Sequence, residues 1–572
     1  MPIKSRESWV VLGLTLLAAI PRLWGLGRMG LVHFDEGEYA LAGLWALDPR
    51  GLAGLDPSVI AYAPPLYPIL AGVAYGLLGV TDLAPILVSI AAGVATVPAV
   101  AVLGRRAFGP GAGAGAAALA ALSGTHVAFS RMGLTDATFL LAWVLALTAG
   151  AAFLERPNVI RALMLGVLVG VAQLVKYNGW LTGAVVGLAA VAGVAFDRDE
   201  RPRGRLARVF GFGMLAAVAA SACYLPWFAF VERHGGYASL LSHQRGYFGG
   251  LGTWPAFLRA QLDQVVGLSG GSLWMAGAWG LAVVAGRFAN GGLTDPARRR
   301  SLVLIASAGL VLTALVPTAG WWLGWIWLAR RAATARAAER VVGVGWVVMT
   351  ILTPMYHPYA RLWMPLHAAG WLMSAGLIVE PAAWLATPRP AVGPLTFGTR
   401  RAIAFLLAIA VLATAQRFWP RPAARALPGL LDPTDSVRIA AGEIAAALPK
   451  EIRTVRALAR PSVLFYLAGR VSVDRVGGRD ALFRAPDPGV WLLDDRAVEP
   501  GPRATDASLT HAPAFQRVAS FETMFSLPTL LDVNPGATRD AHSSTVAPLD
   551  VYRARSADEP HADALPRKST TR

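Results

Sequence analysis

The sequence predicts an all-α polytopic membrane protein with a small α/β domain at its C-terminal end. Three observations support this fold class. The chain of 572 residues is 55% hydrophobic and only 15% charged, whereas a soluble chain carries about 25% charged residues. Apolar runs long enough to cross a bilayer recur from Trp9 to Trp419. Beyond Trp419 no such run occurs, and shorter helix-like and strand-like segments follow.

About thirteen transmembrane helices are expected. The first run has the basic start and apolar middle of a signal peptide, but it lacks a small-residue cleavage site before Arg22, so we expect a retained span. The Gly/Ala-rich stretch 109–124 is expected to be a closely packed span. The expected spans are 8–27, 83–104, 109–129, 137–154, 160–176, 179–196, 209–230, 268–287, 301–316, 319–330, 341–356, 362–380 and 402–419.

The first outer loop contains a segment that tests this count. Residues 64–79 open with two prolines, are short for a crossing and include two tyrosines. We therefore expect an interfacial helix that lies along the membrane surface.

The positions of Lys and Arg predict the orientation. Segments assigned to the inner side hold 22 Lys and Arg residues, and those assigned to the outer side hold 8. Because cytoplasmic loops are enriched in Lys and Arg, we expect a multi-pass protein of the cell (inner) membrane with a cytoplasmic N-terminus. These loops also account for the net charge of +17, and no basic–aromatic pattern predicts a nucleic-acid partner.

The chain therefore divides into three expected parts. Residues 1–419 form the transmembrane domain, 420–560 an extracytoplasmic α/β domain, and 561–572 a disordered tail. Within the α/β domain, periodicity predicts an amphipathic helix at 435–449. It predicts strands at 462–469, 489–495 and 549–555.

Polar groups gather at the outer ends of the expected spans. An ionisable group at bilayer depth costs about 2.5–3.5 kcal/mol on insertion scales, so it normally faces a wet cavity or a partner. We therefore expect an outward-facing polar cleft that could serve an anionic lipid head group and an acid–base reaction. The groups are Asp35, Glu36, Glu38, Arg131, Asp136, Lys176, His357 and Arg361.

Each of these groups also has a structural interpretation. Glu36 or Glu38 could cap the helix that follows, and Lys176 could snorkel. Arg131 and Asp136 could form a positioning salt bridge, or Asp136 could be an N-cap. His357 could be an ordinary loop histidine. The interfacial aromatic belt could include Tyr39, Tyr177 and Tyr359.

No cofactor is certain from the sequence. No pair of residues has reliable metal-ligand spacing, although several carboxylates near a phosphate could hold a divalent cation. No Gly-rich run is followed by Lys and Ser or Thr, which excludes a nucleotide P-loop. The metal requirement is therefore left open.

The order of several motifs resembles that of a known family. They are "HFDEGEYA" (33–40), "PPLYP", "GRRAFG", "SRMGLTDATF", "KYNG" and "HPYARLWMPLHAA". This order is similar to that of polyprenyl-phosphate-sugar-dependent glycosyltransferases of the GT-C class, and most like the protein O-mannosyltransferase and lipid A aminoarabinose transferase group. The resemblance covers about residues 8–380.

The resemblance implies roles for the polar groups. Asp35 would be the catalytic base, with Asp136 as a second conserved acid and Glu36 beside them. Lys176 and Arg361 would meet the donor phosphate. Further substrate contacts would come from Glu38, Tyr39, Tyr62, His357 and Tyr359.

One motif departs from the family pattern. Relatives often carry Lys or His directly before the Pro-Pro pair, whereas this chain has Tyr62 and Ala63. A phosphate contact is therefore missing at this point. Arg131, Arg245 or Lys176 could replace it.

The expected function is transfer of a hexose or pentose from a polyprenyl-phosphate donor on the extracytoplasmic side. The acceptor would be a hydroxyl or phosphate of a lipid, glycan or protein, and the reaction an inverting single displacement with a carboxylate base. A polytopic transporter or lipid-linked-sugar flippase without bond cleavage is the alternative. A non-catalytic scaffold is a third interpretation.

Overall fold

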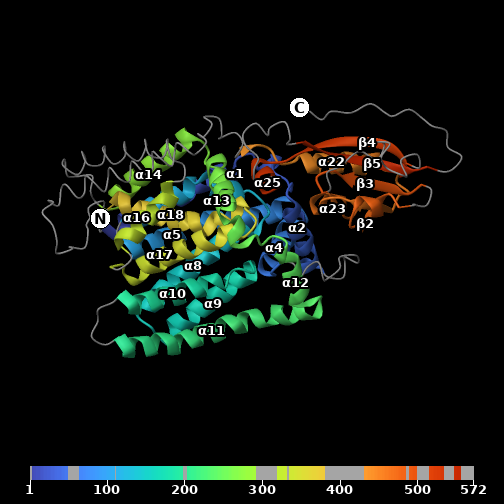
Figure 1. Ribbon diagram of the computed structural model, residues 1–572. Helices are drawn as coiled ribbons and strands as arrows, with labels where there is room; N and C mark the ends of the chain where they lie inside the picture. The colour runs from blue at the N-terminus through green and yellow to red at the C-terminus, as the bar shows by residue number, and fades with distance from the viewer. Residues whose placement is uncertain are drawn as a thin grey trace.

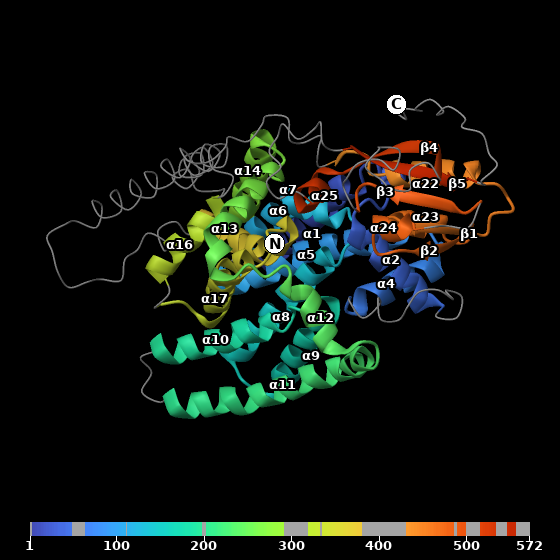
Figure 2. The same ribbon diagram turned by 45° about the vertical axis from the view of Figure 1, so that its right-hand side comes forward.

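The computed structural model describes a helical body followed by an α/β domain (Figure 1). The described residues are 3–48, 63–109, 111–196, 202–290, 319–331, 334–379, 431–484, 489–498, 515–533 and 546–555. The sheet of the α/β domain lies at one end of the helical body, next to α2 and α4 (Figures 1 and 2).

Long helices form most of the body, and short ones connect them. Their bounds are α1 Ile3–Leu23, α2 Phe34–Leu47, α4 Leu66–Leu78, α5 Leu83–Phe108, α6 Ala112–Leu122, α7 Gly124–Ser130, α8 Thr135–Glu155, α9 Val159–Val175, α10 Leu181–Phe196, α11 Pro202–Arg233, α12 Gly236–Arg245, α13 Gly250–Gly267, α14 Ser272–Ala289, α16 Ala319–Arg331, α17 Ala337–Leu352 and α18 Met364–Val379. Three 3₁₀ turns, η1 Leu26–Arg28, η2 Thr353–Met355 and η3 Ala360–Trp363, lie between them.

Five helices in the described part of the chain are long and apolar enough to cross a membrane, or six if the bent pair α6–α7 is one span. Four further apolar helices are shorter. These helices support a multi-pass membrane protein, but the expected number of thirteen spans is not confirmed. Two of the expected spans, 301–316 and 402–419, lie outside the described residues.

The expected span 109–129 is two helices, because α6 and α7 are bent by 59° at Ser123. Ser123 has extended backbone angles, which stop α6. Glycines allow close packing on both sides of the break. A Cβ at Gly113 would lie 2.4 Å from the carbonyl of Ala101, and one at Gly124 would lie 2.2 Å from the carbonyl of Leu268. The expectation of close packing is therefore confirmed, while the single straight helix is not.

Ion pairs join several helix ends at the end of the body far from the sheet. Arg105 lies 3.3 Å from Glu7, and Arg106 lies 2.8 Å from Glu155. These pairs join the start of α1 to the ends of α5 and α8, all of which the sequence assigns to one side. The start of α8 consequently lies toward the opposite end, and the start of α2 lies beside it, because Glu36 accepts a hydrogen bond from the backbone N–H of Gly133.

The α/β domain contains a five-stranded mixed sheet. Its order is β2-β1-β3-β5-β4, with β1 parallel to β2 and β3, and with β5 antiparallel to β3 and β4. The elements are α22 Ser436–Ala447, β1 Thr454–Leu458, α23 Pro461–Leu467, β2 Ser472–Arg475, α24 Arg479–Leu482, β3 Trp491–Asp495, β4 Phe515–Met524, α25 Leu527–Val533 and β5 Val546–Ala554.

The expected helix at 435–449 and strands at 489–495 and 549–555 are confirmed as α22, β3 and β5. The expected strand at 462–469 is wrong, because this segment is α23. Pro461 stands in the first turn, where its missing N–H costs nothing and its fixed φ favours a helix. A short apolar run does not distinguish a buried helix from a strand, and here the run is buried almost throughout.

The α/β domain is docked on the first loop of the body. The hydroxyl of Tyr466 accepts a hydrogen bond from the backbone N–H of Leu31 and donates one to Asp82. Arg438 adds an ion pair of 3.0 Å to Asp82. One apolar core runs through both parts, since residues of α2, α4, α5, α22, α23 and the sheet belong to the same buried cluster. The domain is thus fixed to the loop that carries "HFDEGEYA".

Candidate active site

The first turn of α2 is fixed by reciprocal capping. The Nδ1 atom of His33 accepts a hydrogen bond from the backbone N–H of Asp35, at 3.0 Å. One oxygen of Glu36 accepts hydrogen bonds from the backbone N–H groups of Val32 and His33, and the other accepts one from Gly133 at 2.7 Å. Glu36 is therefore buried with both oxygens satisfied, and it joins α2 to the loop before α8.

Asp35 points away from this cap toward Arg361. The carboxylate lies 2.6 Å from Nη1 of Arg361 and keeps a third of its side-chain surface exposed. Burial raises the pKa of Asp35, but the charge of Arg361 and its hydrogen bond to the carboxylate outweigh this effect and lower the pKa to about 2. Asp35 is therefore ionised at neutral pH and accessible to an incoming group.

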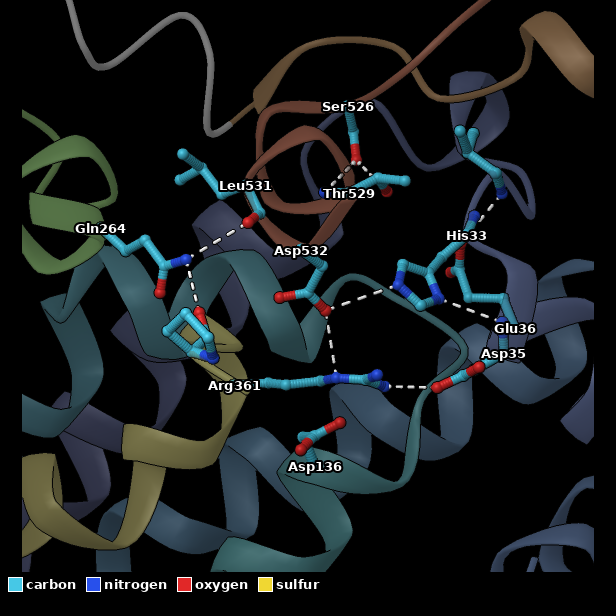
Figure 3. A network of polar contacts seen from close by, with 12 residues as sticks. His33, Asp35, Glu36, Asp136, Gln264, Arg361, Ser526, Thr529, Leu531 and Asp532 are labelled. Atoms are coloured by element: carbon cyan, nitrogen blue, oxygen red, sulfur yellow. Dashed lines mark hydrogen bonds and ion pairs between the residues drawn. The ribbon is translucent and has the colours of Figure 1, made fainter. Parts of the chain in front are cut away.

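Arg361 bridges two carboxylates (Figure 3). It lies on η3, between α17 and α18, where its Nε atom is 3.0 Å from Asp532 of α25. The same oxygen of Asp532 lies 3.4 Å from Nε2 of His33. The guanidinium also lies 4.9 Å from the ring centre of Tyr359, a cation–π distance. Arg361 is thus held by contacts from the first loop, the C-terminal domain and its own turn.

Asp136 and Lys176 form a second ion pair beside this group. Their side chains are 2.5 Å apart, and Asp136 is almost completely buried in the first turn of α8. Figure 3 shows Asp136 just below Arg361. The N-cap of α8 is Leu134, so the alternative of Asp136 as an N-cap is not realised. The other oxygen of Asp136 is buried and has no hydrogen-bond partner among the described residues.

Glu38 and Tyr39 lie one turn further along α2. Glu38 pairs with Arg475 of β2 at 3.0 Å, at the partly exposed junction with the α/β domain. The ring of Tyr39 packs edge-on against Tyr67, with 5.7 Å between the ring centres. Burial is the main cause of the raised pKa of its phenol.

His357 and Tyr359 belong to an aromatic group in front of η3. Their ring centres are 4.4 Å apart, and the ring of Tyr247 is 6.1 Å from Tyr359. The backbone N–H of His357 donates to the carbonyl of Tyr247 at 2.8 Å. Burial lowers the pKa of His357, which favours a neutral imidazole at pH 7.

Three other candidates lie away from the ion pairs or outside the described residues. Arg131 is buried and donates to the carbonyls of Pro21 and Trp24, so it holds the end of α1 and does not pair with Asp136. Arg245 is exposed at the end of α12. Tyr62 lies outside the described residues.

The sequence missed Asp532, His33 and Gln264. Gln264 donates from Nε2 to the carbonyls of Pro358 and Leu531, at 2.6 and 3.2 Å, and so joins α13, the segment before η3, and α25. His33 stands within the quoted "HFDEGEYA" motif, where a capping role was readable from the Glu three residues later. Nothing in the sequence around Asp532 marks it as a partner of the first loop.

The described ranges contain no group of three His, Cys, Asp or Glu side chains arranged to hold a metal ion. What the site does offer is a partly exposed carboxylate, two partly buried cations and a second carboxylate that is buried. This combination suits an anionic substrate that also requires removal of a proton.

Comparisons with known proteins agree with the fold expected from the motifs. The model of the family described as dolichyl-phosphate-mannose-protein mannosyltransferase matches residues 62–227. The structure of apo ArnT from Cupriavidus metallidurans is similar over 95% of this chain and 98% of that one, with a TM-score of 0.54 and 16% identity. The same protein bound to undecaprenyl phosphate gives a TM-score of 0.53, with the same identity and coverage. No curated protein matches the sequence. The resemblance to the GT-C class is thus confirmed at the level of the fold.

Proposed function

We propose that this protein is an integral membrane glycosyltransferase that transfers a sugar from a polyprenyl-phosphate donor to a hydroxyl or phosphate of an acceptor. The observation that carries the proposal is the pairing of Asp35 with Arg361 beside the Asp136–Lys176 pair. The fold supports it, because a protein of similar fold has been solved with undecaprenyl phosphate bound. The sugar would be a hexose or a pentose.

The chemistry requires neutralisation of a leaving phosphate. The anomeric carbon of the donor is bonded to a phosphate oxygen, and negative charge grows on that oxygen as the C–O bond breaks. Arg361 and Lys176 are the two cations that we assign to this charge. Arg361 and Lys176 would also replace the cation that is missing before the Pro-Pro pair. Arg131 would not, because its side chain donates a hydrogen bond to the carbonyl of Pro21 in α1.

The acceptor hydroxyl must lose its proton in the same step. Asp35 is the group we assign as the general base, since it is ionised and partly exposed. A carboxylate whose pKa is near 2 is a weak base. When the donor phosphate shares Arg361, the attraction that lowers the pKa of Asp35 is weakened, and its basicity rises. Donor binding would therefore prepare the base for an inverting single displacement.

The neighbouring acids Asp136 and Glu36 would hold other groups of the site in place and would not take part in the proton transfer. Asp136 holds Lys176 at 2.5 Å and keeps it in the site. Glu36 fixes the first turn of α2, and hence Asp35, through three backbone N–H groups. Tyr39, Tyr359, His357 and Glu38 would line the space for sugar and acceptor, and aromatic rings offer faces for a sugar ring.

The site would face the extracytoplasmic side of the cell membrane. The Lys and Arg bias of the sequence supports a cytoplasmic N-terminus. The ion pairs at Glu7 and Glu155 lie at the other end of the body, which supports placing α2 and the α/β domain on the outer side.

The donor is first identified by mass spectrometry of the lipid that co-purifies with the protein. The test is then a transfer reaction in liposomes that contain this polyprenyl-phosphate sugar. Release of polyprenyl phosphate, lost in Asp35→Asn and retained in Glu155→Gln, is the expected result. Glu155 is a matched control because it is an acid in an ion pair at the far end of the body. Movement of the intact donor across the bilayer without release would instead identify a flippase.

A further inference from the structure

Asp532 belongs to the C-terminal domain but lies in the site of the helical body (Figure 3). It is 1% exposed at its side chain and lies 3.0 Å from Nε of Arg361. Its helix, α25, follows β4 and is held against the body by the hydrogen bond from Gln264 to the carbonyl of Leu531. The domain thus contributes a carboxylate to the same guanidinium that binds Asp35.

With Asp532 in place, the net charge of this group opposes the binding of an additional anion. Asp35, Asp136 and Asp532 supply three negative charges, while Lys176 and Arg361 supply two permanent positive charges. A neutral His33 adds none, since its Nδ1 accepts a hydrogen bond from a backbone N–H. A phosphate group would bring further negative charge into a buried region, where like charges repel strongly.

Of the three carboxylates, Asp532 is the least firmly held. Asp35 receives a hydrogen bond of 2.6 Å from Arg361, and Asp136 receives one of 2.5 Å from Lys176. Both oxygens of Asp532 are buried, yet neither makes a hydrogen bond of good geometry with any described residue. The Nε of Arg361, opposite Asp532, is also without such a bond. This contact is an ion pair in poor alignment, which costs less to exchange than the other two.

From these observations we infer that Asp532 is an internal anion that occupies Arg361 until the phosphate of a polyprenyl lipid displaces it. This inference rests on the proposed function. When the phosphate arrives, the carboxylate of Asp532 leaves the guanidinium of Arg361. One anion thus replaces another, and the number of anions in contact with Arg361 does not increase. Because Asp532 lies on α25, donor binding also breaks the ion pair between that helix and Arg361 of η3. The conformation of α25 in the C-terminal domain therefore depends on whether the donor is bound.

Binding of undecaprenyl phosphate to the full-length protein in detergent tests the inference. Asp532→Asn removes the competing charge but keeps the shape of the side chain, and we expect its Kd to fall roughly tenfold, since juxtaposed like charges oppose binding strongly. Asp532→Glu, which keeps the charge, should bind as the wild type does. Asp474→Asn is the matched control, because Asp474 is paired with Arg456 in the same domain and lies outside the ion-pair group.

Hydrogen exchange on the wild-type protein gives a second measurement that needs no variant. Undecaprenyl phosphate should increase exchange of the amides of 527–533 and leave those of β1 unchanged. Equal or weaker binding by Asp532→Asn, or unchanged exchange in α25 when the lipid binds, would overturn the inference while the proposed function stands. If neither the wild type nor Asp532→Asn binds the lipid, both the inference and the proposed function are wrong.

Discussion

Arg361 and Asp35 are 326 positions apart in the chain, and their side chains meet at 2.6 Å. One residue comes from the turn between α17 and α18, and the other from the first turn of α2. The pair gives the site two states. Without donor, the guanidinium keeps Asp35 ionised but weakly basic; with a phosphate on Arg361, the same carboxylate becomes a stronger base.

Asp35→Asn should abolish transfer while leaving donor binding intact. The amide keeps the size of the carboxyl but cannot take a proton, so kcat should fall by about 10²–10⁴-fold, the usual contribution of a general base. Donor affinity should stay equal or increase, because a negative charge beside Arg361 is lost. The measurement is single-turnover release of polyprenyl phosphate together with a binding isotherm. Near-wild-type turnover would show that Asp35 is not the base.

The pH dependence of kcat/KM follows from the low pKa of Asp35. This parameter reports groups of the free enzyme, and the pKa of Asp35 there is about 2. No loss of activity from protonation of Asp35 should therefore appear as the pH falls from 7 to 4. In Arg361→Ala the attraction is gone, so the pKa of Asp35 rises and the acid limb moves upward in pH. An acid limb at the same pH in both proteins would argue against the pair.

The same pKa predicts the sign of the effect on stability. A carboxyl whose pKa is lower in the folded than in the unfolded protein stabilises the fold above its unfolded pKa, which is near 3.9. This contribution is lost as the pH falls from there through the folded value near 2. Asp35→Asn should therefore reduce the difference in thermal unfolding temperature between pH 5 and pH 2. A difference as large as that of the wild type would contradict the assignment.

Arg361 should contribute mainly to donor affinity. Its removal alone would leave Asp35 and Asp532 close together without a cation, so a charge-balanced variant is the better test. Arg361→Ala with Asp532→Asn should raise the KM for donor about 10- to 100-fold, the effect of losing a buried charged partner. Asp532→Asn alone is the control and should lower this KM. An unchanged KM in the double variant would indicate a structural role for Arg361.

Glu36 should contribute mainly to the stability of the fold, although it stands next to the proposed base Asp35 in the sequence. Glu36→Gln has a single carbonyl oxygen, so it cannot serve the amides of Val32 and His33 on one side and Gly133 on the other. Leaving a buried N–H without a partner costs about 1–3 kcal/mol. Thermal unfolding in detergent should show a lower midpoint for Glu36→Gln than for Glu155→Gln, because Glu155 is exposed.

The sequence predicted the part of the site that depends on local pattern. Acids after the first apolar run and cations at later helix ends singled out Asp35, Asp136, Lys176 and Arg361, because charge is rare and expensive in such a chain, and these four form the two ion pairs of the candidate site. It could not separate Glu36 from Asp35, since their roles differ in what each carboxylate faces: backbone N–H groups for Glu36 and the guanidinium of Arg361 for Asp35. It also missed Asp532, whose role depends on how a separate domain docks. The strand expected at 462–469 failed for a related reason, because α23 is buried almost throughout and a short buried helix has the apolar pattern of a buried strand.

The contact between α2 and α23 gives a test of that docking. A Cβ at Gly37 would lie 2.0 Å from the backbone nitrogen of Ser462, so Gly37→Ala forces the two helices apart. Overpacking of this kind costs about 1–3 kcal/mol. Since α2 also carries Asp35, we expect a lower unfolding midpoint, faster proteolysis between body and domain, and reduced transfer. Gly442→Ala is the matched control, because this helical glycine of α22 has no atom within 4 Å of the added Cβ. Equal behaviour of the two variants would mean that the docking of the domain does not position the site.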